Sequence, residues 1–118
     1  MRVTPKTYSM SFNVKTISVF DRQAKRLVKK FPSLKEELQT LISELKEDPT
    51  KGKRIGHNCQ KVRLAIISKG KGKSGGARVI IHVVYKDGTA YLLTIYDKSE
   101  LENLTDNEVL ELIKLIPK

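Results

Sequence analysis

Cationic side chains crowd the middle third of this 118-residue sequence, and they are the groups best suited to chemistry. Between Pro49 and Lys86 there are ten lysines and arginines and no aspartate or glutamate. Such a cluster suits a polyanion such as nucleic acid, although a basic run can also be ordinary solvated surface. Lysines and arginines can stabilise the negative charge that builds up on phosphorus during phosphodiester cleavage. Clustering also favours the neutral form of a lysine, which brings it closer to a usable base.

The glycine-rich stretch GKGKSGG, residues 70–76, lies within this cluster. Backbone amides around glycines can cradle a phosphate, because no Cβ blocks close approach. The stretch is not a P-loop, since the GxxxxGK[ST] spacing fails and no helix follows, so nucleotide hydrolysis is not expected. It either binds phosphate or serves only as a flexible connection.

Few other residues offer chemistry. His57 and His82 lack metal-ligand spacing, and no Ser/His/Asp arrangement is present, so we expect no metal and no cofactor. The single cysteine, Cys59, excludes an internal disulfide. Tyr96 could stack on a base, donate its phenolic proton or simply pack in the core. What remains is metal-free cleavage of RNA, in which the substrate's own 2′-hydroxyl attacks the phosphate.

The first half of the chain contains three periodic segments that would support such a site. Apolar and polar residues alternate over Tyr8–Val14, which predicts a strand. Residues 20–31 have apolar side chains at helical spacing and a basic opposite face, which predicts an amphipathic helix. Residues 34–45 predict a second helix, with Ser33 and Glu36 spaced as a capping box. The two helices should form a hairpin.

The second half predicts three strands. The first, Lys61–Lys69, has cations on one face, and the next two, 78–85 and 90–96, flank an Asp-Gly turn. A two-residue turn there would place Arg78 opposite Asp97 and His82 opposite Leu93.

The predicted order of elements is β, α, α, β, β, β, α. Thr105 and Glu108 form another capping box before a short helix over residues 109–116. We therefore expect a single α+β domain over residues 1–118: a small antiparallel β-sheet with an N-terminal helical hairpin on one face and a short C-terminal helix.

The face opposite the hairpin should be free for binding, with Lys61, Arg63 and Lys69 directed towards it. The sequence contains no leader-like apolar region near its start and no run long enough to cross a membrane. With a single cysteine, these features favour a cytoplasmic protein.

The sequence resembles the toxins of the RelE/ParE superfamily, and most closely the RelE and HigB-like mRNA interferases of bacterial type II toxin–antitoxin systems. The resemblance rests on FDRQAKRLVKKFPSLKEELQTLISEL, DPTKGKRIG, QKVRLAIISKGKGKSGGARVIIHVV and AYLLTIYDKSELENLT. It implies a bent antiparallel sheet of the microbial-ribonuclease kind. It also implies metal-independent cleavage of mRNA in the ribosomal A site by attack of the 2′-hydroxyl.

The resemblance assigns roles to residues on the predicted strands. Lys61 and Arg63 match active-site cations, Arg78 matches the arginine that contacts the scissile phosphate, and Tyr96 ends the last strand at the site. Ser99 departs from the RelE pattern, which has an arginine there. The candidate catalytic residues are Arg63, Lys73, Arg78 and Tyr96. The candidate RNA- and phosphate-binding residues are Lys61, Lys69, Lys71 and Lys98.

The resemblance also implies a cognate antitoxin, in an oligomer with the toxin. We expect the antitoxin to cover the cationic face or to displace the C-terminal helix with an acidic or amphipathic segment. Two alternatives stand beside the mRNA endonuclease. One is a ParE-like inhibitor of DNA gyrase, and the other is a catalytically inactive module that binds RNA, the ribosome or an antitoxin.

Overall fold

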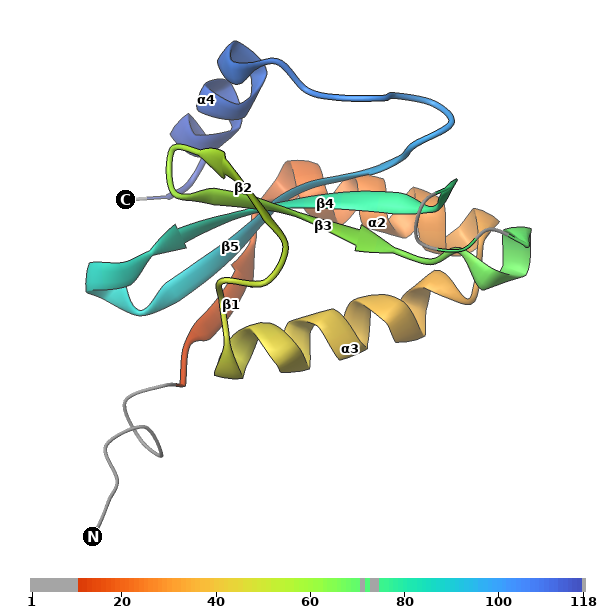
Figure 1. Cartoon of the computed structure of the whole chain (residues 1–118), viewed down its shortest axis with the longest axis horizontal. Helices are drawn as coiled ribbons and strands as arrows, with labels where there is room; N and C mark the ends of the chain where they lie inside the picture. Colours follow the sequence, from red (N-terminus) through yellow and green to blue (C-terminus); the bar gives the residue numbers. More distant parts are fainter. Residues whose placement is uncertain (1–10, 71, 73–74, 118) are drawn as a thin grey trace, which may run out of the picture.

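The computed structural model describes residues 11–70, 72 and 75–117, which form an α+β structure as predicted (Figure 1). Within this described part, one five-stranded sheet has the order β1-β5-β4-β3-β2. The elements in chain order are β1 (Asn13–Thr16), α2 (Ser18–Lys30), α3 (Leu34–Glu47), β2 (Lys53–Gly56), β3 (Cys59–Leu64), the 3-10 helix η1 (Ile67–Lys69), β4 (Ala77–Val84), the 3-10 helix η3 (Tyr85–Asp87), β5 (Thr89–Asp97) and α4 (Asp106–Lys114).

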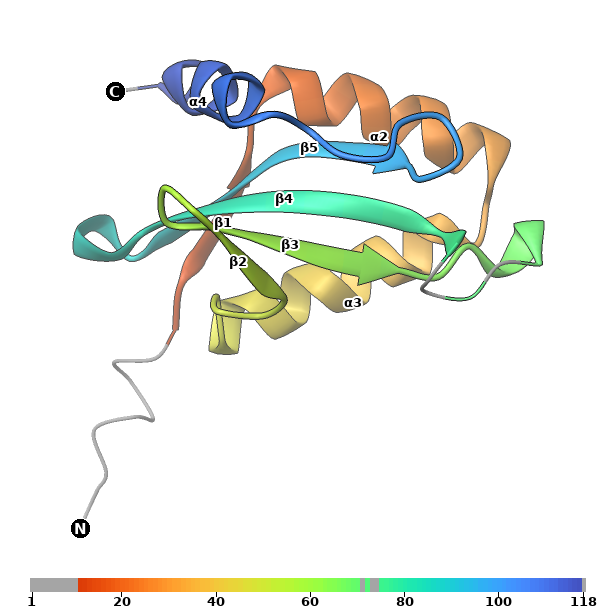
Figure 2. The same ribbon diagram turned by 45° about the horizontal axis from the view of Figure 1, so that its top comes forward.

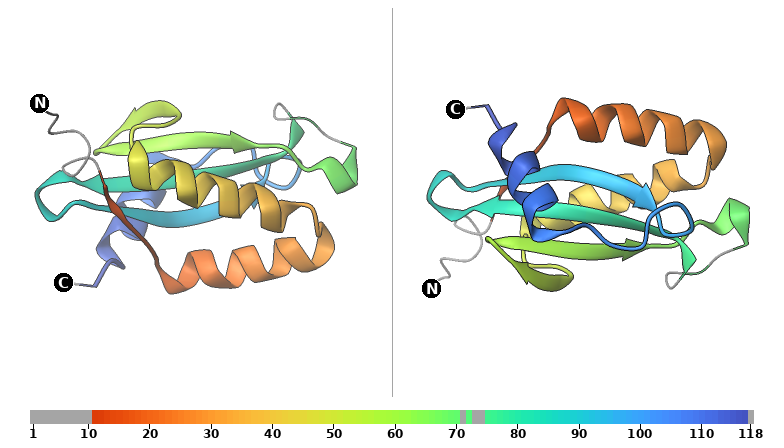
Figure 3. Two further views of the ribbon diagram at one scale, coloured as in Figure 1. Left: turned by 90° about the horizontal axis from the view of Figure 1, so that it is seen from below. Right: turned by 90° about the horizontal axis from the view of Figure 1, so that it is seen from above.

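The sheet lies between two helical layers. Helices α2 and α3 are on one face, where α3 crosses the strands and α2 runs beside β5 (Figure 3, left). Helix α4 and the segment leading to it lie across the other face (Figure 2; Figure 3, right). The leucines of α3 recur every three or four residues, and all four are buried against the sheet: Leu34, Leu38, Leu41 and Leu45. The predicted hairpin layer is therefore confirmed.

The first strand differs from its prediction. It runs over Asn13–Thr16 and pairs in parallel with β5, so the sheet is mixed rather than purely antiparallel. Residues 8–10 of the predicted strand lie outside the described residues. Parallel neighbours need a long connection, which here includes the helical hairpin and the other strands. Alternation of side chains cannot reveal such a distant pairing.

A β2–β3 hairpin lies in the stretch after α3, where the sequence patterns predicted no strand before Lys61. Its two-residue turn is made by His57 and Asn58, which both have positive φ, at 56° and 57°. That conformation is typical of a type I′ turn, but a histidine at its first position gives little signal. Strand β3 then ends at Leu64, so the prediction that it continues to Lys69 is wrong, and residues 67–69 form η1 instead.

The β4–β5 register also differs from the prediction. The turn contains η3 and Gly88, whose φ is +62°, rather than two residues, and a bulge follows Ile80. As a result Arg78 lies opposite Tyr96, and His82 lies opposite Tyr91. The longer turn shifts the partner of His82 by two residues, and the bulge reduces the shift to one residue at Arg78.

The two predicted capping boxes have different outcomes. At α4 the box is present: the Glu108 amide donates to Thr105 Oγ1 at 3.2 Å, and the Thr105 amide donates to Glu108 Oε1 at 2.8 Å. At α3 the prediction is wrong, because Ser33 has helical backbone angles and no cap bond. Its hydroxyl instead accepts from the Ser68 amide at 2.9 Å. This bond ties the turn after β3 to the helical hairpin.

Candidate RNA-binding and catalytic site

Three neighbouring strands bring predicted site residues into one row. Arg63 on β3 pairs with Arg78 on β4, and Arg78 pairs with Tyr96 on β5. Directly paired residues of antiparallel strands project from the same face, so these three side chains share a face. Lys61 joins them there, because it pairs with Ile80, two residues along β4 from Arg78. The structure therefore groups three of the four predicted catalytic residues.

Arg78 is the centre of this row and is only 3% exposed. Its Nη1 donates to the Ala77 carbonyl oxygen at 3.1 Å. Burial lowers the pKa of Arg78, and the neighbouring Arg63 adds to the effect. Even so, a guanidinium stays protonated at neutral pH. Arg78 thus presents a fixed positive charge in a poorly solvated position, where it would act strongly on a phosphate.

Lys61 is set among other cations. Burial lowers its pKa most, and the charges of Lys53, Arg78, Arg63 and Lys98 lower it further. The pKa of a lysine falls when nearby positive charge makes the ammonium form unfavourable. The site therefore favours loss of the Lys61 proton relative to an isolated lysine.

Tyr96 is buried, with 5% of its surface exposed. Burial raises the pKa of its phenol, and the charge of Arg78 opposes that effect. Its hydroxyl finds no hydrogen-bond partner among the residues that the structure describes. A buried hydroxyl without a partner costs about 1–3 kcal/mol, so packing must hold it in place. The phenol stays protonated and can donate a hydrogen bond to a group that reaches it.

The expectation that this face is open is wrong. The segment between β5 and α4 crosses it, and Lys61 Nζ donates to Asn103 Oδ1 at 2.9 Å. Below this segment lies a cavity of about 210 Å³. It is lined by Ile55, Lys61, Ile80, Tyr96, Asn103, Leu104, Asp106 and Val109. The capping box predicted where α4 begins, but a cap carries no information about where a helix packs.

The remaining predicted residues are placed differently. Lys98 follows β5, and its amide donates to the Gly76 carbonyl oxygen at 3.0 Å. Lys69 belongs to η1 rather than to β3. Lys71 and Lys73 lie outside the described residues. Ser99, where the RelE pattern has an arginine, donates through its amide and hydroxyl to Asp97 Oδ1, at 3.0 and 2.9 Å.

Sequence reasoning missed two residues that contact the site strands. Asn103 bonds Lys61, as described above, and Gln23 on α2 accepts from the Ile95 amide at 3.1 Å. Both contacts join residues far apart in the chain. Neither residue belongs to a motif, so no local signal could have found them.

The same face continues to a Cys–His pair at its other end. Cys59 pairs with His82, and Cys59 Sγ lies 3.5 Å from His82 Nδ1. The thiol is 2% exposed, and burial raises its pKa to about 11. We expect iodoacetamide at about pH 8 to alkylate native Cys59 about 100-fold more slowly than the urea-unfolded chain. Mass spectrometry of the timed reaction gives both rates, and equal rates would contradict the buried placement.

His82 makes folding stability depend on pH. Burial lowers its pKa, so the folded chain holds fewer protons than the unfolded chain below the ordinary histidine value of about 6.5. The destabilisation is therefore absent above about pH 6.5 and grows as pH falls towards the lowered pKa. Thermal melts from about pH 7.5 to about pH 5 should show a larger loss of stability in the wild type than in His82→Gln. Parallel curves would assign the pH dependence to other groups.

Two features are absent from the part of the chain that the structure describes. Across residues 11–70, 72 and 75–117, no three His, Cys, Asp or Glu side chains gather in a way that could hold a metal ion. No helix in this part of the chain has the length and apolar character needed to cross a membrane.

Comparison with known proteins gives a family match for the sequence and similar structures for the fold. A family profile described as "RelE toxin of RelE / RelB toxin-antitoxin system" matches residues 16–117. The fold resembles a free E. coli RelE toxin with two arginines replaced by alanine, with a TM-score of 0.59 and 19% identity. That match covers 92% of this chain and all of the other. A crystal structure of the isolated E. coli RelE toxin matches with a TM-score of 0.53 and 15% identity, over 90% of this chain and all of the other.

Proposed function

The chain belongs to the RelE toxin family of RelE/RelB toxin–antitoxin systems, and we propose that it is a ribosome-dependent mRNA endonuclease that blocks translation. The observation that carries the proposal is the row Arg63, Arg78 and Tyr96, which spans three strands beside Lys61. The row combines fixed positive charge, a lysine of lowered pKa and a protonated phenol.

These groups supply what RNA cleavage by internal attack requires. The 2′-oxygen forms a bond to phosphorus while the bond to the 5′-oxygen breaks, which leaves a 2′,3′-cyclic phosphate and a 5′-hydroxyl. Lys61 in its neutral form takes the 2′-proton, and Tyr96 donates to the departing 5′-oxygen. Arg63 and Arg78 stabilise the additional negative charge on the phosphoryl oxygens. In this proposal, side chains of the protein make both proton transfers and stabilise the additional negative charge.

Substrate access requires the cover on this face to move. Only 5% of Tyr96 is exposed, and Asn103 and Leu104 line the cavity beside it, so a phosphate cannot reach the phenol while the segment before α4 stays in place. Within that segment, the bond from Lys61 to Asn103 must be exchanged for RNA contacts. We propose that ribosome-bound mRNA displaces the segment.

The family pairs its toxins with an antitoxin, and the formal charge of +10 favours an acidic partner segment. We propose that this antitoxin neutralises the toxin through the same cationic face or by displacing α4. A neighbouring apolar groove of about 420 Å³, between α2, the end of β5 and α4, could take an amphipathic segment. Its lining includes Leu104, Leu112 and Leu115.

Primer extension on a translated mRNA, in purified reactions with and without ribosomes, tests the function. We expect breaks at codon positions only when ribosomes are present. Fragments ending in a 2′,3′-cyclic phosphate would support attack by the 2′-hydroxyl. Intact mRNA in every reaction, together with inhibition of gyrase supercoiling, would replace this proposal with the ParE-like alternative.

A further inference from the structure

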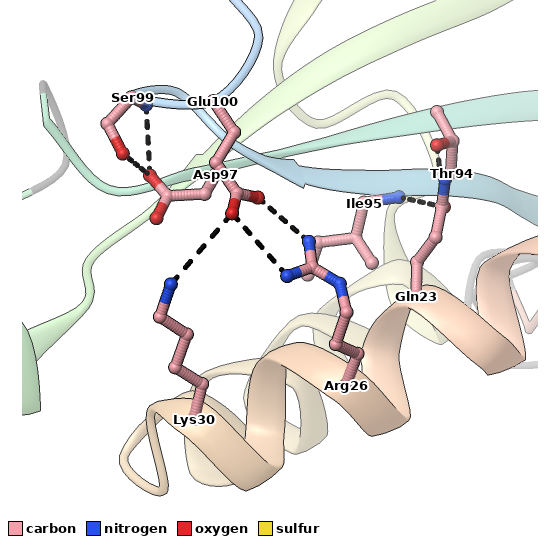
Figure 4. Close-up of polar contacts among 8 residues, drawn as sticks. All are labelled: Gln23, Arg26, Lys30, Thr94, Ile95, Asp97, Ser99 and Glu100. Atoms are coloured by element: carbon pink, nitrogen blue, oxygen red, sulfur yellow. Dashed lines mark hydrogen bonds and ion pairs between the residues drawn. The ribbon is translucent and has the colours of Figure 1, made fainter.

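A polar stripe on α2 faces the end of strand β5 (Figure 4). Gln23, Arg26 and Lys30 occur at intervals of three and four residues, so they lie on one side of the helix. All three contact the stretch from Thr94 to Glu100. This stretch contains Tyr96. The stripe therefore contacts β5, the strand that carries Tyr96, from the side of the sheet on which α2 lies.

Gln23 holds the outer edge of β5. Strand β1 pairs with β5 only as far as Leu92, so within the described chain no strand pairs with this outer edge of β5 beyond that residue, while β4 remains paired with the other edge. The Gln23 side-chain oxygen accepts from the Ile95 amide at 3.1 Å and from Thr94 Oγ1 at 2.7 Å. A side chain thus takes the place of a neighbouring strand immediately before Tyr96.

Arg26 and Lys30 hold the chain immediately after β5. The Arg26 guanidinium donates to both Glu100 oxygens, at 2.8 Å from Nη2 to Oε1 and at 3.4 Å from Nη1 to Oε2. Lys30 Nζ lies 3.9 Å from Oε2. The hydrogen bond from Arg26 lowers the pKa of Glu100, so the carboxylate is charged at neutral pH. A two-pronged contact of this kind fixes direction as well as distance.

The turn between these two anchors is also internally bonded. The amides of Glu100 and Leu101 both donate to the Asp97 carbonyl oxygen, at 2.9 and 3.1 Å. Within the turn, the Lys98 amide donates to Gly76, two residues before Arg78. A shift of Glu100 would therefore also shift the backbone of Lys98 and, through Gly76, the strand that carries Arg78.

We propose that Gln23 and Arg26 are positioning residues that set Tyr96 and Lys98 against Arg78. The inference rests on the proposed function for its kinetic consequence. Neither residue touches the site face, and each acts through the backbone of β5 or of the turn that follows. An error of about 1 Å in the placement of catalytic groups can lower a rate about 100-fold, so exposed contacts of this kind can matter for turnover.

The first test compares Arg26→Glu with Lys25→Glu. Both variants change the charge of α2 equally, but Lys25 is exposed and has no ion pair or hydrogen bond among the described residues. We expect both to raise KM alike, through weaker attraction to RNA. Only Arg26→Glu should lower kcat, by about tenfold. Adding Glu100→Arg to Arg26→Glu should restore kcat to within about threefold of the wild type. Equal kcat values for the two single variants would overturn the proposal.

The second test separates this inference from the proposed function. Amide hydrogen exchange at Lys98 and Glu100 needs no substrate. We expect exchange at both amides to be about fivefold faster in Arg26→Glu than in Lys25→Glu, with equal melting temperatures. If the wild type fails to cleave mRNA but this difference is seen, the proposed function fails and the anchoring role of Arg26 stands. Equal exchange in the two variants would overturn the anchoring role whatever the activity.

Discussion

Arg78→Ala should lower ribosome-dependent mRNA cleavage by about 100- to 1000-fold. Arg78 pairs with Arg63 on one neighbouring strand and with Tyr96 on the other, and it is almost completely buried, so its charge is held in a poorly solvated position. Removing a preorganised charge that stabilises a developing oxyanion typically has an effect of this size. The measurement is the initial cleavage rate on ribosome-bound mRNA by quantitative primer extension. A rate within threefold of the wild type would remove Arg78 from the mechanism.

The control for this result must separate chemistry from folding. A buried arginine also packs, so Arg78→Ala can lower stability, and its melting curve has to be recorded alongside. Arg78→Lys keeps a charge but loses the planar fork, and we expect it to retain only part of the activity. Arg22→Ala on the exposed side of α2 removes one positive charge far from the row. It should leave kcat unchanged, which shows that the loss of net charge alone is not responsible.

The sequence predicted which strands carry the candidate site residues better than it predicted their cross-strand partners. Periodicity found the two helices, β4 and β5, because their buried apolar residues recur at regular intervals. Arg78 and Tyr96 were therefore placed on the right strands. Their register was off by one residue, because the turn at Gly88 is longer than two residues and a bulge follows Ile80. Both features depend on backbone conformations that are only weakly encoded in the side chains.

Long-range contacts could not be predicted at all. The parallel pairing of β1 with β5, the packing of α4 on the site face and the bond from Gln23 to Ile95 each join distant parts of the chain. Local patterns report which side of an element is apolar, but not which surface it meets. The segment that crosses the site face and the bonds from α2 to β5 both depend on which surfaces meet, so only the structure reveals them.

Gly76→Ala should destabilise the protein by about 3 kcal/mol and lower cleavage. A Cβ on Gly76 would collide with the Leu64 carbonyl oxygen and would lie only 3.1 Å from the Ile66 nitrogen. These are backbone atoms, which cannot move aside as a flexible side chain could. Since the Gly76 carbonyl also holds the Lys98 amide, any backbone shift reaches Lys98 and Arg78 together. Urea unfolding measures the stability, and primer extension measures the cleavage.

Gly72→Ala in the same glycine-rich stretch is the matched control. Nothing lies within 4 Å of a Cβ at Gly72, so we expect stability within about 1 kcal/mol of the wild type. The two variants distinguish whether glycine is needed here for flexibility or for the close approach of two backbone segments. If both are destabilised equally, general flexibility is what the stretch requires. If only Gly76→Ala is destabilised, that glycine is needed because two segments of backbone meet there, beside the strand that presents Arg78.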